Sequence, residues 1–172
     1  MINLRIYSVF LLTVIWSPLH SIDRPDNQQL PLQIDANSIQ HNDAKAVTKF
    51  IGNVVLIRGD LTLKGDSLIL NQTEDGLSFG KVIGSPAVFQ TRRRVEDGWV
   101  KGQALELDYD ERNSTFLLKG NAKLVRLENG KIKEEVSGDE LSYNSDSEVY
   151  NAITEPGETR TRMTVIPKPS NE

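Results

Sequence analysis

The amino-acid sequence predicts an all-β protein, because short runs of alternating apolar and polar residues follow one another and turn signals separate them. In residues 102–109, GQALELDY, the side chains of Leu105, Leu107 and Tyr109 fall on one face of an extended chain. The pair Asn129-Gly130 is typical of a hairpin turn, since both residue types tolerate positive φ. Regular turns between such runs are typical of a sandwich or a barrel. We find no long segment with the 3, 4 and 7 spacing of an amphipathic helix.

The N-terminal segment has the features of a secretory signal peptide. Arg5 and the terminal amine are positive, and the apolar run at 6–16 is shorter than the roughly 20 residues that a membrane span requires. A small residue, Ser21, ends the segment, so we expect cleavage close to it and export of the mature chain. An uncleaved membrane anchor is the alternative. The predicted organisation is a signal peptide at 1–21, a flexible leader at 22–29, a β domain at 30–166 and a flexible tail at 167–172.

An internal repeat runs through the predicted β domain. Glycines at 52, 84 and 120 each begin a strand-like run, and a second glycine follows a turn in each unit, at 65, 102 and 138. We interpret each unit as a pair of bent strands whose apolar face is buried by stacking on its neighbours. A glycine that recurs at one place predicts a bulge or a corner. Ordinary loop glycines between separate strands are the alternative.

Composition and motifs argue against several functions. The 172 residues include no cysteine, which excludes disulfides, thiolate metal sites and a cysteine nucleophile. Only two histidines, His20 and His41, are present, and we find no catalytic or nucleotide-binding motif. The net charge of −4 argues against a nucleic-acid footprint. We therefore predict a protein that has no metal and no cofactor.

The only dense basic cluster is Arg92-Arg93-Arg94, just before the turn signal Asp97-Gly98. A solvated hairpin tip is one interpretation of this cluster. Contact with an anionic lipid headgroup is the other.

Several short segments are informative because of the order in which they occur. They are FIGNV at 50–54, KGD at 64–66, GSPAVF at 84–89, GQALELDY at 102–109, GNA at 120–122, GDELSY at 138–143 and RMTVIP at 162–167. This ordered set resembles the OstA-like family of periplasmic proteins, and the resemblance covers about residues 30–170.

The resemblance implies an open, slightly twisted β-jellyroll of two antiparallel sheets that binds lipopolysaccharide (LPS) acyl chains between the sheets. It implies a periplasmic bridge, not an enzyme, that receives LPS from LptC at its N-terminal edge and passes it to LptD at its C-terminal edge. Head-to-tail pairing of copies of the chain is also implied. Strand-like ends at 30–36 and 159–166 agree with this, since exposed sheet edges are templates for strand addition.

Alternation of apolar residues predicts which side chains face the groove. Among them, Leu32, Ile34, Phe89 and Tyr109 occupy positions that resemble the lipid-facing ones of the family. Lys123 falls where the first unit has Val55, so we leave the residues after Gly120 unassigned until Leu141. The predicted groove set is Leu32, Ile34, Ile39, Val55, Ile57, Leu68, Leu70, Phe89, Leu105, Leu107, Tyr109, Leu141 and Tyr143.

Three other functions remain open from the sequence. The first is an LptC-like jellyroll of the same pathway that keeps a membrane anchor. The second is a structural β-repeat protein without a ligand. The third is a sugar-active enzyme on a jellyroll, since fold alone does not define function.

Overall fold

The computed structural model describes residues 30–73, 78–94, 97–157 and 160–167. The predicted signal peptide, the leader and the tail from 168 onward lie outside these residues. Ten strands and one short 3₁₀ helix, η2 (Asp43–Lys45), make up the described chain. The strands are β1 (Gln33–Asp35), β2 (Ser38–Asn42), β3 (Val47–Arg58), β4 (Leu61–Gln72), β5 (Ser78–Arg92), β6 (Trp99–Asp110), β7 (Thr115–Glu128), β8 (Lys131–Asn144), β9 (Tyr150–Ile153) and β10 (Arg162–Val165).

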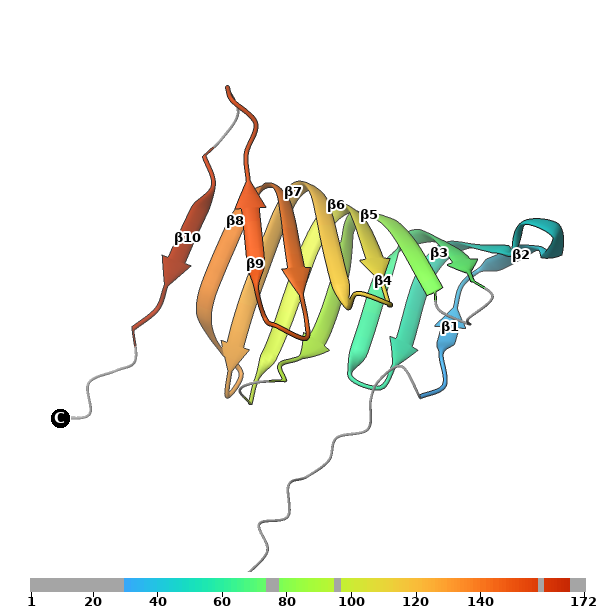
Figure 1. Ribbon diagram of the computed structural model, residues 1–172, viewed down its shortest axis with the longest axis horizontal. Coiled ribbons are helices and arrows are strands. Elements are labelled where there is room, and N and C mark those ends of the chain that lie inside the picture. The colour runs from blue at the N-terminus through green and yellow to red at the C-terminus, as the bar shows by residue number, and fades with distance from the viewer. Residues whose placement is uncertain (1–29, 74–77, 95–96, 158–159, 168–172) are drawn as a thin grey trace, which may run out of the picture.

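The six long strands, β3 to β8, form an antiparallel meander in which each strand pairs with the next. Both β1 and β2 pair with β3, whereas β9 and β10 both pair with β8. The N-terminal and C-terminal edges therefore lie at opposite ends of the molecule, as Figure 1 shows. The predicted all-β, open antiparallel fold is confirmed, and the two predicted sheets are two layers of one continuous sheet.

A line of bends crosses the middle of the long strands and separates the two layers. The strand register shifts at this line in each pairing from β3–β4 to β7–β8. In β3 the bend is Gly52-Asn53, with φ of 80° and 50°, and in β7 it is Gly120-Asn121, with 78° and 52°. Such left-handed conformations favour glycine and asparagine, which explains why this pair recurs in the sequence.

Each long strand thus contributes one segment to each layer. The first layer consists of β2, β9 and residues 47–51, 67–72, 78–83, 106–110, 115–119 and 139–144. The second layer consists of β1, β10 and residues 54–58, 61–64, 87–92, 99–103, 122–128 and 131–138. Figure 1 shows the strands curving over at this line.

Aromatic side chains hold the layers together. The ring of Phe89, from the second layer, stacks on that of Phe116, from the first, with centroids 4.2 Å apart and an interplanar angle of 7°. The Tyr109 ring stacks on the same Phe116 ring with centroids 4.6 Å apart, and the centroid of the Tyr143 ring lies 6.1 Å from that of Phe89. Because offset stacking adds to the burial of apolar area, this cluster is the centre of the core.

The outer face of the first layer is charged. Nζ of Lys81 lies 2.5 Å from Oε1 of Glu106, and Nζ of Lys119 lies 3.0 Å from Oδ2 of Asp108. The two residues of each pair lie on neighbouring strands. These hydrogen-bonded carboxylates raise the pKa of both lysines. The outer face of this layer therefore carries charged pairs, whereas its buried apolar side chains face the other layer.

The recurring glycines have two different roles. Gly52, Gly84 and Gly120 lie on the bend line, as the repeat predicted, and Gly65 and Gly138 flank register shifts there. The prediction was wrong for Gly102, which pairs in regular register with Phe89 and is buried. A Cβ at position 102 would lie 2.0 Å from Cε1 of Phe89, so glycine is required there for close approach and not for a bend.

We expect Gly102→Ala to lower the free energy of unfolding by about 1–3 kcal/mol, because the added methyl group overpacks the core against Phe89 and Leu118. Urea denaturation measures the change. Gly80→Ala is the matched control, since a Cβ there would meet the nearest side-chain atom, on Leu68, at an ordinary 3.5 Å. An equal loss in both variants would contradict this role of Gly102.

Candidate functional site

Two rows of apolar side chains face each other between the layers and run across every strand, from one edge of the molecule to the other. Directly paired residues of antiparallel strands share a face, so the register identifies the members of each row. The row of the first layer is Ile39, Phe50, Leu68, Val82, Leu107, Leu118, Leu141 and Ala152. The row of the second layer is Ile34, Leu56, Leu63, Phe89, Gly102, Leu124, Val136 and Met163.

The interior of both rows is tightly filled, and the ends are open. Leu68, Leu107 and Phe89 are completely buried, whereas Ile39 at the N-terminal edge is 59% exposed and Met163 at the C-terminal edge is 54% exposed. The apolar stripe thus reaches the surface at both edges.

Near the N-terminal edge the layers separate into a crevice. Apolar side chains of both layers line it, and one arginine and one glutamate lie among them. The lining residues are Leu32, Leu56, Arg58, Leu61, Leu63, Leu70, Gly80, Tyr109 and Glu111. The crevice has a volume of about 10 Å³, room for about one water molecule, so an acyl chain could enter it only if the layers moved apart.

Two tyrosines bring hydroxyl groups into this interior. Burial raises the pKa of Tyr109 to about 12 and that of Tyr143 to about 12. Among the described residues, the buried hydroxyl of Tyr143 has no hydrogen-bond partner. This hydroxyl is therefore an uncompensated polar group within the apolar stack.

We call the side of the molecule opposite the bend line, where the long strands end, the rim. Ion pairs join the two layers along this rim. Arg58, at the end of β3, pairs with Glu111 in the β6–β7 turn. Arg93, after β5, donates from Nε and Nη2 to Glu148, at 2.9 and 2.7 Å. Glu148 lies in the loop between β8 and β9. Each pair joins a second-layer arginine to a first-layer loop.

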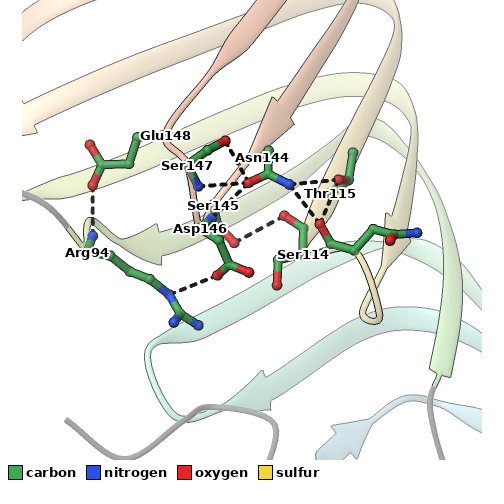
Figure 2. A network of polar contacts seen from close by, with 9 residues as sticks. Arg94, Ser114, Thr115, Asn144, Ser145, Asp146, Ser147 and Glu148 are labelled. Carbon is green, nitrogen blue, oxygen red and sulfur yellow. Dashed lines mark hydrogen bonds and ion pairs between the residues drawn. The ribbon is translucent and has the colours of Figure 1, made fainter. Parts of the chain in front are cut away.

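Arg94 makes two contacts with the same loop. Its backbone N–H donates to Oε1 of Glu148 at 2.8 Å, and its Nε lies 3.1 Å from Oδ1 of Asp146. Figure 2 shows these contacts beside the Asn144 side chain, whose Oδ1 accepts from the N–H of Asp146 and of Ser147. The loop is thus held both internally and to the second layer.

The arginine cluster is therefore a solvated hairpin tip only in part, because the side chain of Arg94 is 51% exposed. Arg93 is buried, and Arg92 lies over the Trp99 ring, 5.6 Å from its centroid, and pairs with Asp97 at 3.1 Å. The turn alone could not reveal this, because the acidic partners of Arg93 and Arg94 lie more than 50 residues further along the chain.

Most of the predicted groove set lies on the inward face. Ten side chains do so: Leu32, Ile34, Ile39, Leu68, Leu70, Phe89, Leu107, Tyr109, Leu141 and Tyr143.

Three predicted groove residues, Val55, Ile57 and Leu105, face outward instead. Val55 pairs with Asp35 and Lys64, while the neighbouring Val54 and Leu56 are buried. Ile57 shares this outer face and is 40% exposed, and Leu105 is 50% exposed. The physical reason is the bend, since the residues at each register shift reverse the facing of the residues that follow.

Sequence reasoning also missed inward residues on both sides of the bends, including Leu56, Leu63, Val82, Phe116, Leu118, Leu124 and Val136. Lys123 indicates which residues after the bend in β7 face outward. It faces outward and pairs with Glu135 at 2.8 Å, which makes Leu124 the inward residue.

Within the described residues, no group of three or more His, Cys, Asp or Glu side chains is placed to hold a metal ion. Helices long and apolar enough to cross a membrane are likewise absent from the described part of the chain.

The fold and the site together define an open antiparallel β-jellyroll with an apolar stripe between its layers. The family described as LptA/(LptD N-terminal domain) LPS transport protein matches residues 33–149, and the chain belongs to this family. Lipopolysaccharide export system protein LptH of Pseudomonas aeruginosa is 23% identical over 168 residues, which cover 93% of each protein.

A solved structure shares the fold. It is the crystal structure of LptH from Pseudomonas aeruginosa, described as the LptA homologous periplasmic component of the conserved lipopolysaccharide transport device. The TM-score is 0.74 at 22% identity, and the match covers 83% of this chain and 100% of that one.

We expect opposite effects from removing two tyrosine hydroxyls. Tyr143→Phe keeps or raises the free energy of unfolding at pH 8, because it deletes an unpartnered buried hydroxyl. Tyr150→Phe lowers it by about 1 kcal/mol, because the Tyr150 hydroxyl donates to Glu134. Urea denaturation of both variants gives the comparison, and a larger loss in Tyr143→Phe would contradict it.

The same experiment has a pH-dependent part. Unfolded tyrosine ionises near pH 10, whereas Tyr143 in the fold keeps its proton up to about pH 12. The unfolded chain therefore loses this proton first, so stability falls as the pH rises from 10 toward 12. In Tyr143→Phe that fall should be smaller.

Proposed function

We propose that this protein is a periplasmic LPS carrier, not an enzyme, that holds acyl chains between its two layers. The observation that supports this most directly is the pair of apolar rows that cross all strands from edge to edge. Acyl chains would bind such a stripe by buried area, at about 0.8 kcal/mol per CH₂ group, without a specific bond. Movement along the stripe then needs comparable affinity at successive positions.

The edges of the two layers are proposed as the junctions with neighbouring proteins. The C-terminal edge carries exposed apolar side chains, namely Val149, Ile153, Met163, Val165 and Ile166. In the proposal, LptC pairs with the β1–β2 edge and LptD with the β9–β10 edge, by strand addition. The same pairing between copies of this chain would extend both apolar rows from one copy to the next.

Two alternatives, an LptC-like anchored protein and a structural β-repeat protein, differ from this carrier in measurable ways. An LptC-like anchored protein keeps its Met1 segment, whereas the exported carrier begins near Ile22. A structural β-repeat protein would bind no lipid between its layers.

Photo-crosslinking at matched inward and outward positions tests the groove. We expect a photoreactive residue at Tyr109, which lines the crevice, to capture LPS in cells. The same residue at Leu105, on the outer face of the same strand, should not. Equal capture at both positions, or at neither, would contradict lipid binding between the layers.

A charge at the C-terminal edge tests the junction. Val165→Lys should weaken self-association about tenfold, because a valine that a neighbour would bury is worth at least about 1.4 kcal/mol. Sedimentation velocity over a range of concentrations measures this. Leu105→Lys, at an exposed position away from both edges, is the control and should associate like the unmodified chain.

A further inference from the structure

The closed interior leaves a physical problem for a lipid carrier. The stacked rings of Phe89, Phe116 and Tyr143 occupy the space between the layers, and all three are buried. Acyl chains therefore need the layers to move apart. The strands are covalently continuous across the bend line, so the opening has to occur at the opposite rim.

Among the described residues, three ion pairs with the same polarity bridge this rim. The arginines lie at or just after the ends of second-layer strands, and the carboxylates all come from first-layer loops. We name these six residues the rim latch: Arg58 with Glu111, Arg93 with Glu148, and Arg94 with Asp146.

Glu148 is the most constrained member of the latch. Its side chain is 6% exposed and accepts from the side chain of Arg93 and the backbone of Arg94. Its backbone carbonyl accepts from Nη2 of Arg126 at 2.7 Å. Its φ is 56°, a conformation that costs a glutamate energy and persists where surrounding contacts hold it. The contacts from the second layer thus hold this loop in a conformation that it would not favour alone.

The latch also adjoins the apolar crevice. Arg58 and Glu111 line that crevice together with Leu32, Leu61 and Tyr109. A lipid whose anionic group replaced Glu111 on Arg58 would therefore place its chains directly against the apolar lining.

We propose that the rim latch opens when a phosphate group of an acylated anionic lipid replaces the carboxylates on Arg58, Arg93 and Arg94. This inference rests on the proposed carrier function and adds how the groove opens. The guanidinium fork matches phosphate as well as carboxylate, so the arginines exchange one anion for another and are not left unpaired. A neutral lipid offers no such exchange and would have to open the rim against intact ion pairs.

The two partners of one pair then have different roles. Loss of the carboxylate loosens the rim and leaves in place the arginine that would bind the lipid phosphate. Loss of the arginine loosens the rim equally but removes the guanidinium group that would bind the lipid phosphate. A purely structural ion pair predicts the same effect from both losses.

The Arg94–Asp146 pair suits this test because both side chains are 51% exposed, so both variants should fold. We expect Asp146→Asn to bind bisphosphorylated lipid A about two- to fivefold faster than the unmodified protein, the range for a surface ion pair. Arg94→Gln should reduce the preference for this lipid over its dephosphorylated form by a similar factor. Lys101→Gln, an exposed charge on the outer face of the second layer, controls for net charge and should change neither.

Rim opening is measured directly by spin labels. The chain has no cysteine of its own, so Asn113→Cys in the first-layer β6–β7 turn and Lys131→Cys at the second-layer end of β8 label one site in each layer. We expect bound bisphosphorylated lipid A to lengthen the distance between the two labels, and inorganic phosphate alone to leave it unchanged.

The outcomes separate this inference from the function on which it rests. If the unmodified protein binds neither lipid between its layers, the carrier function fails and the latch with it. If it binds both lipids equally and the label distance stays constant, the carrier function stands and the latch is wrong. An unchanged lipid preference in Arg94→Gln, or lengthening by inorganic phosphate alone, would also overturn the exchange mechanism.

Discussion

The line of bends across the long strands is the constraint on which the rest of the structure depends. At Gly52-Asn53 and Gly120-Asn121 the chain adopts left-handed conformations and the register shifts. The sheet therefore folds over on itself, and the apolar sides of its two halves meet. The two facing rows, their open ends and the location of the rim all follow from this line. Without it, the same alternating strands would form one flat sheet with an exposed apolar face.

Much of the fold was predictable from the sequence because the relevant signals are local. Alternation indicated strands, and Asn129-Gly130 forms the two-residue turn of the β7–β8 hairpin as predicted. Gly59-Asp60 forms the equivalent turn between β3 and β4. The recurring glycines indicated the bends, although Gly102 is required by the ring of Phe89 on the neighbouring strand. That distinction depends on a cross-strand contact, which spacing along one chain does not contain.

The facing of residues after each bend was harder to predict, because one extra residue reverses it. Val55 and Lys123 follow the same Gly-Asn pair by the same number of residues, and both face outward. Lys123 departs from the apolar pattern of the other units, but its outward position is the correct one for the equivalent residue of both strands. The rim ion pairs were not predictable at all, since Arg93 and Glu148 are 55 residues apart and meet only after the sheet has folded over.

The meander also has a consequence for how stability is distributed. Among the six long strands, each pairs only with its neighbours in sequence, so the hydrogen-bonded sheet resembles a short linear array. In such an array the terminal units have one neighbour instead of two, and they open at the lowest free energy. The short strands β1, β2, β9 and β10 are these terminal units. The parts of the chain that amide hydrogen exchange should find least protected are thus the same parts that a neighbouring protein would bind and complete.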